Sequence, residues 1–470
     1  MEEEVSIGKS ESTDFVSLKE AINYLAERFQ KQSEKSPVHV VSHFDTDGIT
    51  SASIITKCLQ RDDVEFDLTI LKSLTPEIIS TLPKEGILFF LDLASNSLDI
   101  LATLNQQVFI LDHHEVSQEI PENVTIANPR LQESNEEISS AGLCYLFAKK
   151  ISSENKDLAP LAIVGMVGDS IETISLNNSE IARDSEVIIK KGLKIYPSTR
   201  PINRALEFSS SPYIPGVTGD REGVVQLLRD AKIERDDGKY KNLIELSEEE
   251  MTRIVTAIML KTMKKSEEGI IGNIFLIKQF NQLEDARELS AKINATSRLG
   301  EPYKAVLYCL GQADAKKSVE NMYAKYKQFI ISGLKKVEKL EKAEGKGYLI
   351  INAKNEISDA IIGVIASILS HSSVYEEGTI IVAMSYSEEK KIKVSGRAVG
   401  KTNRNLREIF ERVTLNIGGE FGGHPQAAGC IIDSMREQEF IETIKKSLEI
   451  ELVKINPSPV NPQENQSQNL

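Results

Sequence analysis

The sequence has 470 residues, with no tryptophan and only four cysteines. The cysteines stand far apart and form no CxxC pair, so neither a zinc site nor a disulfide framework is indicated, and a reducing cytoplasm is the expected location. No apolar run is long enough to cross a membrane, and the first residues (MEEEVSIGKSES) are acidic and polar, unlike a signal peptide. We therefore expect a cytoplasmic protein without a membrane partner.

The charge balance is acidic, with a formal net charge of −14. This excess argues against a protein that coats polyanions nonspecifically. It does not exclude an enzyme that acts on nucleic acid, because an acidic site filled by divalent metal ions becomes locally positive. The length and the 40% hydrophobic content predict two or three domains, each with its own core.

One stretch, VVSHFDTDG at residues 40–48, organises the rest of the chain. Its apolar β-branched run stops at His43, Asp45 and Asp47 follow in alternation, and a segment with helical spacing begins at Ile49. A buried strand followed by a helix places ligands at the carboxyl edge of a parallel sheet, where open α/β folds bind them. Two carboxylates so close together repel each other unless a cation lies between them. By itself, a solvated Asp-rich turn would explain the motif equally well.

Further strand-like runs alternate with helical segments, which is typical of a doubly wound parallel sheet. The runs are His39–Ser42, Phe66–Leu71, Ile87–Leu91 and Val108–Leu111. The third run leads directly into Asp92 and the fourth into Asp112-His113-His114, while a later apolar segment, Leu158 to Val167, reaches Asp169. Solvation explains one aspartate on a surface, but not aspartates placed repeatedly at the ends of buried runs.

These motifs carry a family resemblance. HFDTDG, FFLDLAS, ILDHHE and IVGMVGDS, in this order, resemble the four motifs of the DHH phosphoesterase superfamily, which is named for the third. Near the C-terminus, GGEFGGHPQAAG (418–429) resembles the GGGHxxAAG signature of the associated DHHA1 domain, with Phe421 where a glycine is commoner. Residues 205–223 and 285–300 resemble archaeal RecJ-like nucleases, including the type that associates with the GINS replication complex.

The resemblance implies two metal ions at the edge of the sheet. The ligands of one ion would be His43, Asp45 and Asp92; those of the other would be Asp47, Asp92, His113 and Asp169, with Asp92 as the bridge. Imidazole mixed with carboxylate suits Mn²⁺ better than Mg²⁺, although Mg²⁺ could replace it. Two such ions stabilise the attacking and leaving oxygens during in-line attack on phosphorus. Besides Asp92, the expected catalytic residues are Asp112, which would orient a histidine through its ring N–H, and His114, which would face the scissile phosphate.

Contacts with substrate phosphates are expected at two further places. Asn294 and Arg298 lie four apart on a predicted helix and share a face, although a surface polar pair would look the same. In the second domain, a glycine pair permits close approach of the backbone to a phosphate, with a histidine as hydrogen-bond donor. An arginine at a strand end could bind a phosphate through two N–H groups of its guanidinium. A solvated basic face would explain the outer lysines of the basic stretch around this arginine, which comprises Lys390, Lys391, Lys393, Arg397, Lys401, Arg404 and Arg407. The predicted substrate contacts are Asn294, Arg298, Arg397, Gly422, Gly423 and His424.

The predicted fold is α/β, with six segments along the chain. These are an N-terminal helical extension (1–36), a doubly wound DHH domain (37–200), a RecJ-like middle region (201–311), a long interdomain helix (312–345), a smaller α/β DHHA1 domain (346–455) and a tail without a core (456–470). A cleft between the two α/β domains would select a single strand by shape, because a duplex is wide and stiff.

The resemblance predicts a metal-dependent exonuclease that acts on single-stranded nucleic acid, DNA above all, in replication or repair. On the resemblance alone, its partners would include the GINS complex and the replicative helicase. One alternative is a replisome scaffold comparable to the eukaryotic helicase cofactor of this superfamily, which kept the fold and lost the ligands. Another is an oligoribonuclease or small phosphodiesterase. Base-specific reading is not indicated, because no RNP-type aromatic motif is present.

Overall fold

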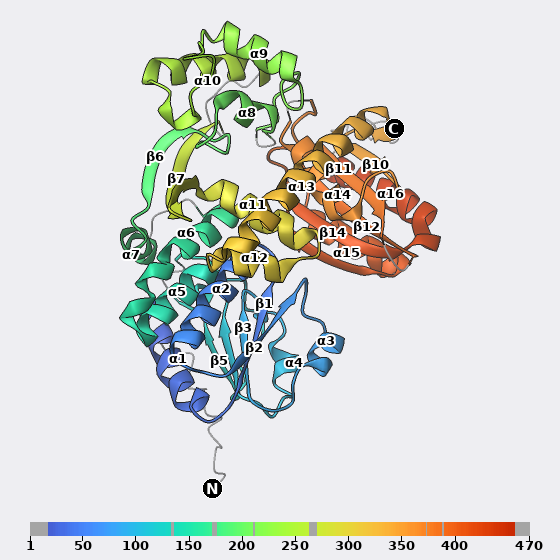
Figure 1. The fold of residues 1–470 in the computed structure, drawn as a ribbon. Helices are drawn as coiled ribbons and strands as arrows, with labels where there is room; N and C mark the ends of the chain where they lie inside the picture. The colour runs from blue at the N-terminus through green and yellow to red at the C-terminus, as the bar shows by residue number, and fades with distance from the viewer. Residues whose placement is uncertain are drawn as a thin grey trace, which may run out of the picture. The chain divides into compact units, whose positions relative to one another are not determined.

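The computed structural model describes residues 17–132, 136–171, 176–209, 212–262, 270–372, 374–387 and 390–455, so the predicted tail lies outside the described residues. The chain forms two compact units (Figure 1). The first comprises residues 1–202, 241–246 and 271–326, and the second comprises 203–240, 247–270 and 327–470. The cleft predicted between the two α/β domains depends on how the two units are placed, so it stays a prediction.

The first unit is built on a five-stranded parallel sheet in the order β2-β1-β3-β4-β5. The chain passes from β1 outward to β2 and then returns to the other side of β1 as β3. The carboxyl ends of β1 and β3 therefore flank the point where the strand order reverses, and open α/β sheets bind their ligands at such a point. The strands are β1 (Val38–His43), β2 (Phe66–Leu71), β3 (Ile87–Leu91), β4 (Val108–Leu111) and β5 (Val124–Ala127).

Helices cover both faces of this sheet, which confirms the doubly wound prediction (Figure 1). Alternate strand residues point to opposite faces. Val40 and Phe89 pack with the helices α1, α2, α5 and α6, whereas Val41 and Phe90 pack with α3 and α4. The helix bounds are α1 (Leu18–Ser33), α2 (Thr46–Arg61), α3 (Pro76–Thr81), α4 (Leu98–Leu101), α5 (Ser140–Ile151), α6 (Ala159–Gly168) and α7 (Leu176–Asp184).

Local sequence explains most of these elements. Ser17 caps α1, as its spacing to Glu20 predicts, by accepting the Glu20 N–H. The four predicted strands are confirmed with ends within one residue. The apolar segment Leu158 to Val167 is a helix, α6, and not another strand, so Asp169 reaches the sheet edge from a helix C-terminus. An unbroken apolar run does not distinguish a buried strand from a buried helix.

A smaller antiparallel sheet, in the order β6-β7-β8, and two helices complete the first unit. Sequence reading missed this sheet because β6 (IIKKGL) is half polar and shows no clear alternation. The long helix α13 then begins in the first unit and ends in the second. The bounds are β6 (Ile188–Leu193), β7 (Ile271–Gln279), β8 (Gln282–Asp285), α11 (Ala286–Arg298), α12 (Pro302–Cys309) and α13 (Ala313–Lys339).

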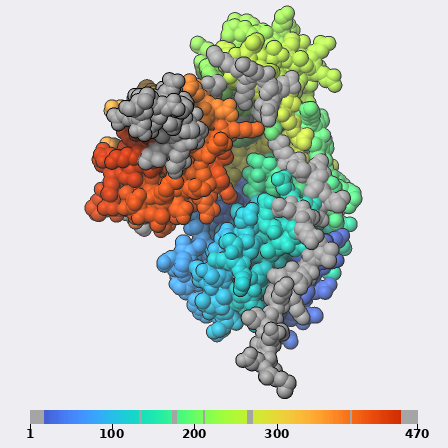
Figure 2. All heavy atoms as spheres, turned by 180° about the vertical axis from the view of Figure 1, so that it is seen from behind, coloured from blue at the N-terminus to red at the C-terminus, as the bar shows by residue number. Residues whose placement is uncertain are grey.

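The second unit contains a six-stranded mixed sheet, β13-β14-β12-β11-β10-β9. Its apolar core lies between one face of the sheet and the helices α15 and α16, and its orange-to-red residues form one packed mass in Figure 2. The bounds are β9 (Lys342–Gly345), β10 (Tyr348–Asn352), α14 (Asp359–Ser370), β11 (Ile380–Tyr386), β12 (Lys391–Ala398), α15 (Leu406–Ile417), β13 (Glu420–His424), β14 (Ala427–Asp433) and α16 (Glu437–Ile455).

Two predictions for the second unit need correction. Its glycines suggest that the motif GGEFGGH is a loop, but residues 420–424 form the edge strand β13, which pairs with residues 427–431 and leads by a tight turn into β14. The apolar spacing of α13 predicts a buried stripe that includes Phe329 and Val337, but Phe329 is 38% exposed, whereas Val337 is buried.

The rest of the second unit is a helical segment comprising α8 (Ile202–Glu207), α9 (Arg221–Asp230) and α10 (Glu248–Thr262). Among the described residues, no helix combines the length and apolarity that a membrane span requires.

Candidate metal centre

The motif after β1 is positioned by the start of helix α2. His43 ends the strand, and Asp45 is the residue that caps α2, since its side chain accepts the Gly48 N–H at 3.1 Å. Asp47 lies in the first turn and is fully buried. Carboxylates are favoured at a helix N-terminus because the free N–H groups there carry partial positive charge. Gly48 is required for close packing, since a Cβ would lie 2.2 Å from the His43 carbonyl oxygen.

The next two strands bring further ligands to the same edge. Asp92 follows β3 and Asp112 follows β4, and Asp92 adopts a left-handed backbone with φ 59°. Strained backbone of this kind persists where surrounding structure fixes it, often at functional sites. Here the Asp92 N–H donates to the Leu111 carbonyl oxygen at 3.0 Å, and Ser140 Oγ donates to Asp92 Oδ1 at 3.0 Å.

The residues of both predicted ligand sets meet around Asp92. His43, Asp45 and Asp92 form one group, and Asp47, His113 and Asp169 form another, with ligand atoms inside each group within 4.8 Å of one another. A third group of the same kind joins Asp92 to His113 and His114. Asp92 Oδ2 lies 3.3 Å from His43 Nδ1, whereas Asp92 Oδ1 lies 3.6 Å from His113 Nε2. The two oxygens of one carboxylate therefore face different groups, as a bridging ligand requires.

Asp112 contacts the protein rather than either group. Its Oδ1 accepts the backbone N–H of His113 at 2.8 Å and lies 2.7 Å from His114 Nδ1, while its Oδ2 accepts the Ser95 N–H at 3.1 Å. These contacts hold the pKa of Asp112 well below its usual range, although burial alone would raise it. The other ring nitrogen of His114 is left available, and this side chain is 42% exposed.

The residues fit divalent ions. Burial and the charges of Asp45, Asp47 and Asp169 raise the pKa of Asp92 well above its usual value. Such a cluster of carboxylates is destabilising without a compensating cation. In addition, the buried His43 Nδ1 lies 3.1 Å from Asp45 Oδ2 but makes no hydrogen bond of good geometry. Ligand atoms about 2.0–2.2 Å from one metal ion lie roughly 3–4 Å from each other, so the observed spacings are compatible.

The pKa shifts predict how stability depends on pH and metal. Burial and the charge of Asp169 raise the pKa of Asp47 from 3.8 to about 7, and nearby carboxylates raise that of His113 from 6.5 to about 10 despite burial. Both groups bind more protons in the folded state than in the unfolded state, so the stability of the metal-free protein should fall as the pH rises. For Asp47 the loss occurs between pH 3.8 and about pH 7, and for His113 between pH 6.5 and about pH 10. Metal binding needs deprotonated ligands and should offset this loss.

We expect the difference in melting temperature between Mn²⁺-saturated and chelated protein to grow from about pH 5.5 to about pH 8, because the ligands lose protons in this range. Thermal unfolding at several pH values measures it. A difference that stays constant with pH would show that the ion binds elsewhere.

Sequence reading missed the residues that support the centre. The carboxylate of Asp47 accepts the backbone N–H groups of Ser140 at 2.7 Å and Ala141 at 3.0 Å, at the start of α5. Gly165 on α6 leaves room for this carboxylate, since a Cβ there would lie 2.5 Å from Asp47 Oδ1. The only sequence feature that points to these contacts is Ser139-Ser140 before an apolar run, which is a common helix start and does not by itself indicate a metal site.

Helix α11, remote in sequence, packs against the first motif. Thr46 Oγ1 donates to the Ser290 carbonyl at 3.0 Å, and Ser297 Oγ donates to the Phe44 carbonyl. Arg298, at the end of α11, lies with its guanidinium 5.9 Å from the centre of the Phe44 ring. The predicted contact Arg298 therefore lies beside Phe44, the residue between His43 and Asp45 in the sequence, and Asn294 lies one turn earlier on the same helix.

The remaining predicted contacts lie together in the second unit. Arg397 on β12 and His424 on β13 both pair with Ala427 of the strand between them, so the three side chains share one face of the sheet. Arg397 is half-buried and donates to its neighbour's carbonyl, whereas His424 is exposed, as are Gly422 and Gly423 on the same edge strand.

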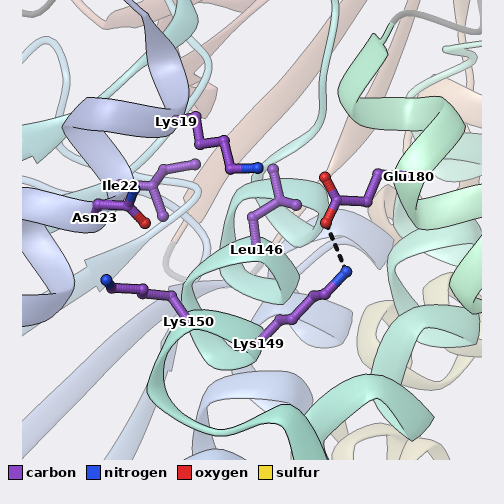
Figure 3. Close-up of a pocket in the computed structure, with 7 residues that line it drawn as sticks. All are labelled: Lys19, Ile22, Asn23, Leu146, Lys149, Lys150 and Glu180. Atoms are coloured by element: carbon purple, nitrogen blue, oxygen red, sulfur yellow. Dashed lines mark hydrogen bonds and ion pairs between the residues drawn. The ribbon is translucent and has the colours of Figure 1, made fainter.

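A separate hollow in the first unit is lined by three lysines, two of them in ion pairs (Figure 3). It measures about 200 Å³ and lies among α1, α5 and α7, away from the ligand groups. Lys149 Nζ lies 2.6 Å from Glu180 Oε1, and Lys150 Nζ lies 3.1 Å from Glu27 Oε1. None of the residues that line it belongs to the ligand groups, so the hollow is not part of the metal centre.

Comparison with known families agrees with this geometry. Residues 37–166 match the DHH family, N-terminal domain, residues 196–270 the DHH-CID domain, and residues 345–449 the DHHA1 domain. The chain belongs to the DHH phosphoesterase superfamily. A relative in Methanocaldococcus jannaschii, the uncharacterized protein MJ0831, is 28% identical over 425 residues, which cover 87% of this chain and 92% of the relative.

Several solved structures share the fold of this DHH protein. CDC45 from Entamoeba histolytica gives a TM-score of 0.64 at 13% identity, over 92% of this chain and 99% of that one. RecJ from Thermus thermophilus, in complex with Mn²⁺, gives 0.59 at 16% identity, over 93% of this chain but only 56% of RecJ. An exonuclease RecJ bound to manganese gives 0.57 at 16% identity, over 92% and 94%. The DHH fold with its second α/β domain thus spans most of this chain.

Proposed function

We propose that this DHH protein is a metal-dependent exonuclease that hydrolyses phosphodiester bonds in single-stranded nucleic acid, with DNA as the preferred substrate, in replication or repair. The observation that carries the proposal is a pair of ligand groups with Asp92 between them, one of its carboxylate oxygens facing His43 and the other facing His113. A chain that had lost catalysis would have no reason to keep buried, mutually repelling carboxylates. Fold relatives that include an exonuclease bound to manganese support it.

Each residue has a role in this proposal. His43, Asp45, Asp47, Asp92, His113 and Asp169 would hold two divalent ions, Mn²⁺ or Mg²⁺. Such ions supply charge that stabilises the attacking and leaving oxygens. Asp112 would keep the proton on His114 Nδ1, so that the other ring nitrogen faces the scissile phosphate.

Phosphates of the strand would be bound on both units, by Arg298 and Asn294 on the first and by Arg397 and His424 on the second. Phosphate contacts position a strand without reading its sequence.

A timed digestion of end-labelled single- and double-stranded DNA and RNA, with Mn²⁺, with Mg²⁺ and with a chelator, tests the proposal. We expect stepwise shortening of single strands that depends on the metal. Products of one discrete internal cut would indicate a different nuclease, and hydrolysis of dinucleotides alone would indicate an oligoribonuclease or small phosphodiesterase.

A second candidate is a replisome scaffold. The CDC45 structure matches this chain over nearly the full length of both, whereas the chain spans only about half of T. thermophilus RecJ. A scaffold should bind its partners with or without Mn²⁺ and should hydrolyse nothing. Association with the GINS complex and the replicative helicase is compatible with either candidate and rests on sequence resemblance alone.

Replacing Arg397 tests the predicted phosphate contact. Arg397→Ala should weaken binding of a long single strand by about tenfold and reduce the salt dependence of binding by about one unit of slope, as loss of one phosphate contact requires. Hydrolysis of a mononucleotide-like model ester should hardly change. Lys446→Ala, which removes an exposed cation from α16, is the control. Equal losses on both substrates would place Arg397 in the chemical step or the fold.

A further inference from the structure

An aromatic side chain, Phe44, stands in the middle of the first ligand motif. Its neighbours in the chain are the predicted ligands His43 and Asp45, and helix α2 begins two residues later. Phe44 is half-buried, and it is not among the described residues that form the apolar cores on the two faces of the first sheet. Single half-buried apolar residues are common on protein surfaces, so the place of this ring beside the ligands matters more than its exposure.

The ring of Phe44 contacts groups of the site. Its centre lies 5.0 Å from the centre of the His43 imidazole, with the two ring planes at 83°. Such an edge-to-face contact is a preferred geometry for two aromatic rings and limits the tilt of both. The guanidinium of Arg298 lies 5.9 Å from the centre of the same ring. The phenyl ring therefore has a predicted metal ligand and a predicted phosphate contact as its neighbours.

The backbone that carries this ring is fixed from two sides. Ser297 Oγ donates to the Phe44 carbonyl, and Thr46 Oγ1 donates to the Ser290 carbonyl at 3.0 Å, so helix α11 holds the motif. On the other side, Asp45 accepts the Gly48 N–H at 3.1 Å at the start of α2. The ring is thus held in place before any substrate binds, and a preorganised contact avoids the entropy loss of ordering a mobile one.

A flat apolar ring beside a phosphate site suits a nucleobase. Proteins that bind single strands without sequence preference combine cationic contacts to phosphates with aromatic side chains on which bases stack. A phenyl ring offers no atom that ligates a metal ion or transfers a proton, so Phe44 has no part in the chemical step. The base of a nucleotide is joined to its phosphate through one sugar. A phosphate held at the ligand groups therefore brings its base to the ring that borders them.

We propose that the Phe44 ring stacks against the base of a nucleotide that flanks the scissile bond. The base lies on the phenyl ring while its phosphate lies at the ligand groups, and Arg298 binds the next phosphate of the strand. This inference rests on the proposed function and adds a base-binding subsite to it. The subsite favours nucleic acid over phosphate esters that carry no base, and it does so without a preference for sequence, because every base has a face that stacks.

A comparison of two single strands tests the subsite. One strand is intact, and the other lacks the bases on both sides of the first bond that is cut. The measured quantity is the ratio of kcat/KM for the intact strand to kcat/KM for the abasic strand, both with Mn²⁺. Both strands undergo the same chemical step, so damage to the metal centre or to the fold lowers both values and leaves the ratio unaltered. For the unaltered protein we expect a ratio of about ten or more, the effect of one stacked base.

Variants at Phe44 should change this ratio in opposite ways. Phe44→Leu keeps an apolar side chain but removes the ring, so the ratio should fall to about one. Phe44→Tyr keeps the ring and should keep the ratio. The control is Phe329→Leu, the same change at a phenylalanine of α13 that is 38% exposed, and it should have the ratio of the unaltered protein.

Three results would overturn the subsite while the proposed function stands. A ratio near one in the unaltered protein would show that no base is bound beside the bond. An unchanged ratio in Phe44→Leu would show that another group binds the base, and an equal fall in Phe329→Leu would show that the effect does not belong to Phe44. If the unaltered protein hydrolyses neither strand, the proposed function itself fails, and the subsite fails with it.

Discussion

Asp92→Asn should lower hydrolysis by about 10³-fold or more, because removal of even one preorganised electrostatic contact costs an enzyme about 10²–10³. The same change should not destabilise the metal-free protein. Burial and neighbouring carboxylates raise the pKa of Asp92, so its charge opposes folding near neutral pH, and an amide of the same shape removes that repulsion. Ser140 Oγ can still donate to the amide oxygen.

Added metal should make the unaltered protein more stable than the Asp92→Asn variant. Mn²⁺ at 100 times its dissociation constant should stabilise the unaltered protein by about 2.7 kcal/mol and the variant far less. Thermal unfolding with Mn²⁺ and with a chelator, beside calorimetric titration of Mn²⁺, measures both effects. Asp62→Asn, at an exposed helix end, is the control. Near-normal turnover by Asp92→Asn would mean that the two-metal site is misplaced.

The sequence was sufficient to predict the first sheet and the residues at its edge. β1, β3 and β4 are short apolar runs bounded by polar residues, and in a parallel sheet their carboxyl ends meet at one edge. It follows that Asp92 comes close to His43, although it lies 49 positions further along the chain. The strand order, which puts β1 beside β3, could not be read from the runs themselves.

The contacts that hold the predicted metal ligands in place could not be predicted from the sequence, because they depend on packing between distant segments. Ser290 and Ser297 are ordinary polar residues on an amphipathic helix until α11 is placed against Phe44 and Thr46. Gly165 is an ordinary helical glycine until Asp47 is placed beside it. Arg404 belongs to a basic stretch of the sequence, where charge suggests an exposed side chain, yet it is only 2% exposed and its guanidinium donates to three backbone carbonyl oxygens.

Asp112→Asn should act oppositely to Asp92→Asn on stability, although both changes replace a buried carboxylate by an amide of the same shape. All of the contacts recorded for Asp112 come from N–H groups: the backbone of Ser95, His113 and His114, and the ring of His114. An amide NH₂ in either orientation faces at least one of these donors, and Asp112 is only 1% exposed, so water cannot intervene. A buried donor left without its acceptor costs about 1–3 kcal/mol, and bonds to a charged acceptor lie at the upper end.

We therefore expect Asp112→Asn to lower the free energy of unfolding by about 2–4 kcal/mol, with or without metal, since Asp112 belongs to neither ligand group. Activity should fall by about 10–100-fold even at saturating Mn²⁺, because outer contacts of this kind typically contribute that much, and the proton on His114 Nδ1 would lose its acceptor. Chemical denaturation and Mn²⁺-saturated turnover, measured beside Asp92→Asn, separate the two carboxylates. If both variants responded to Mn²⁺ alike and unfolded alike, Asp112 would itself be a metal ligand, and its assignment as the residue that orients His114 would be wrong.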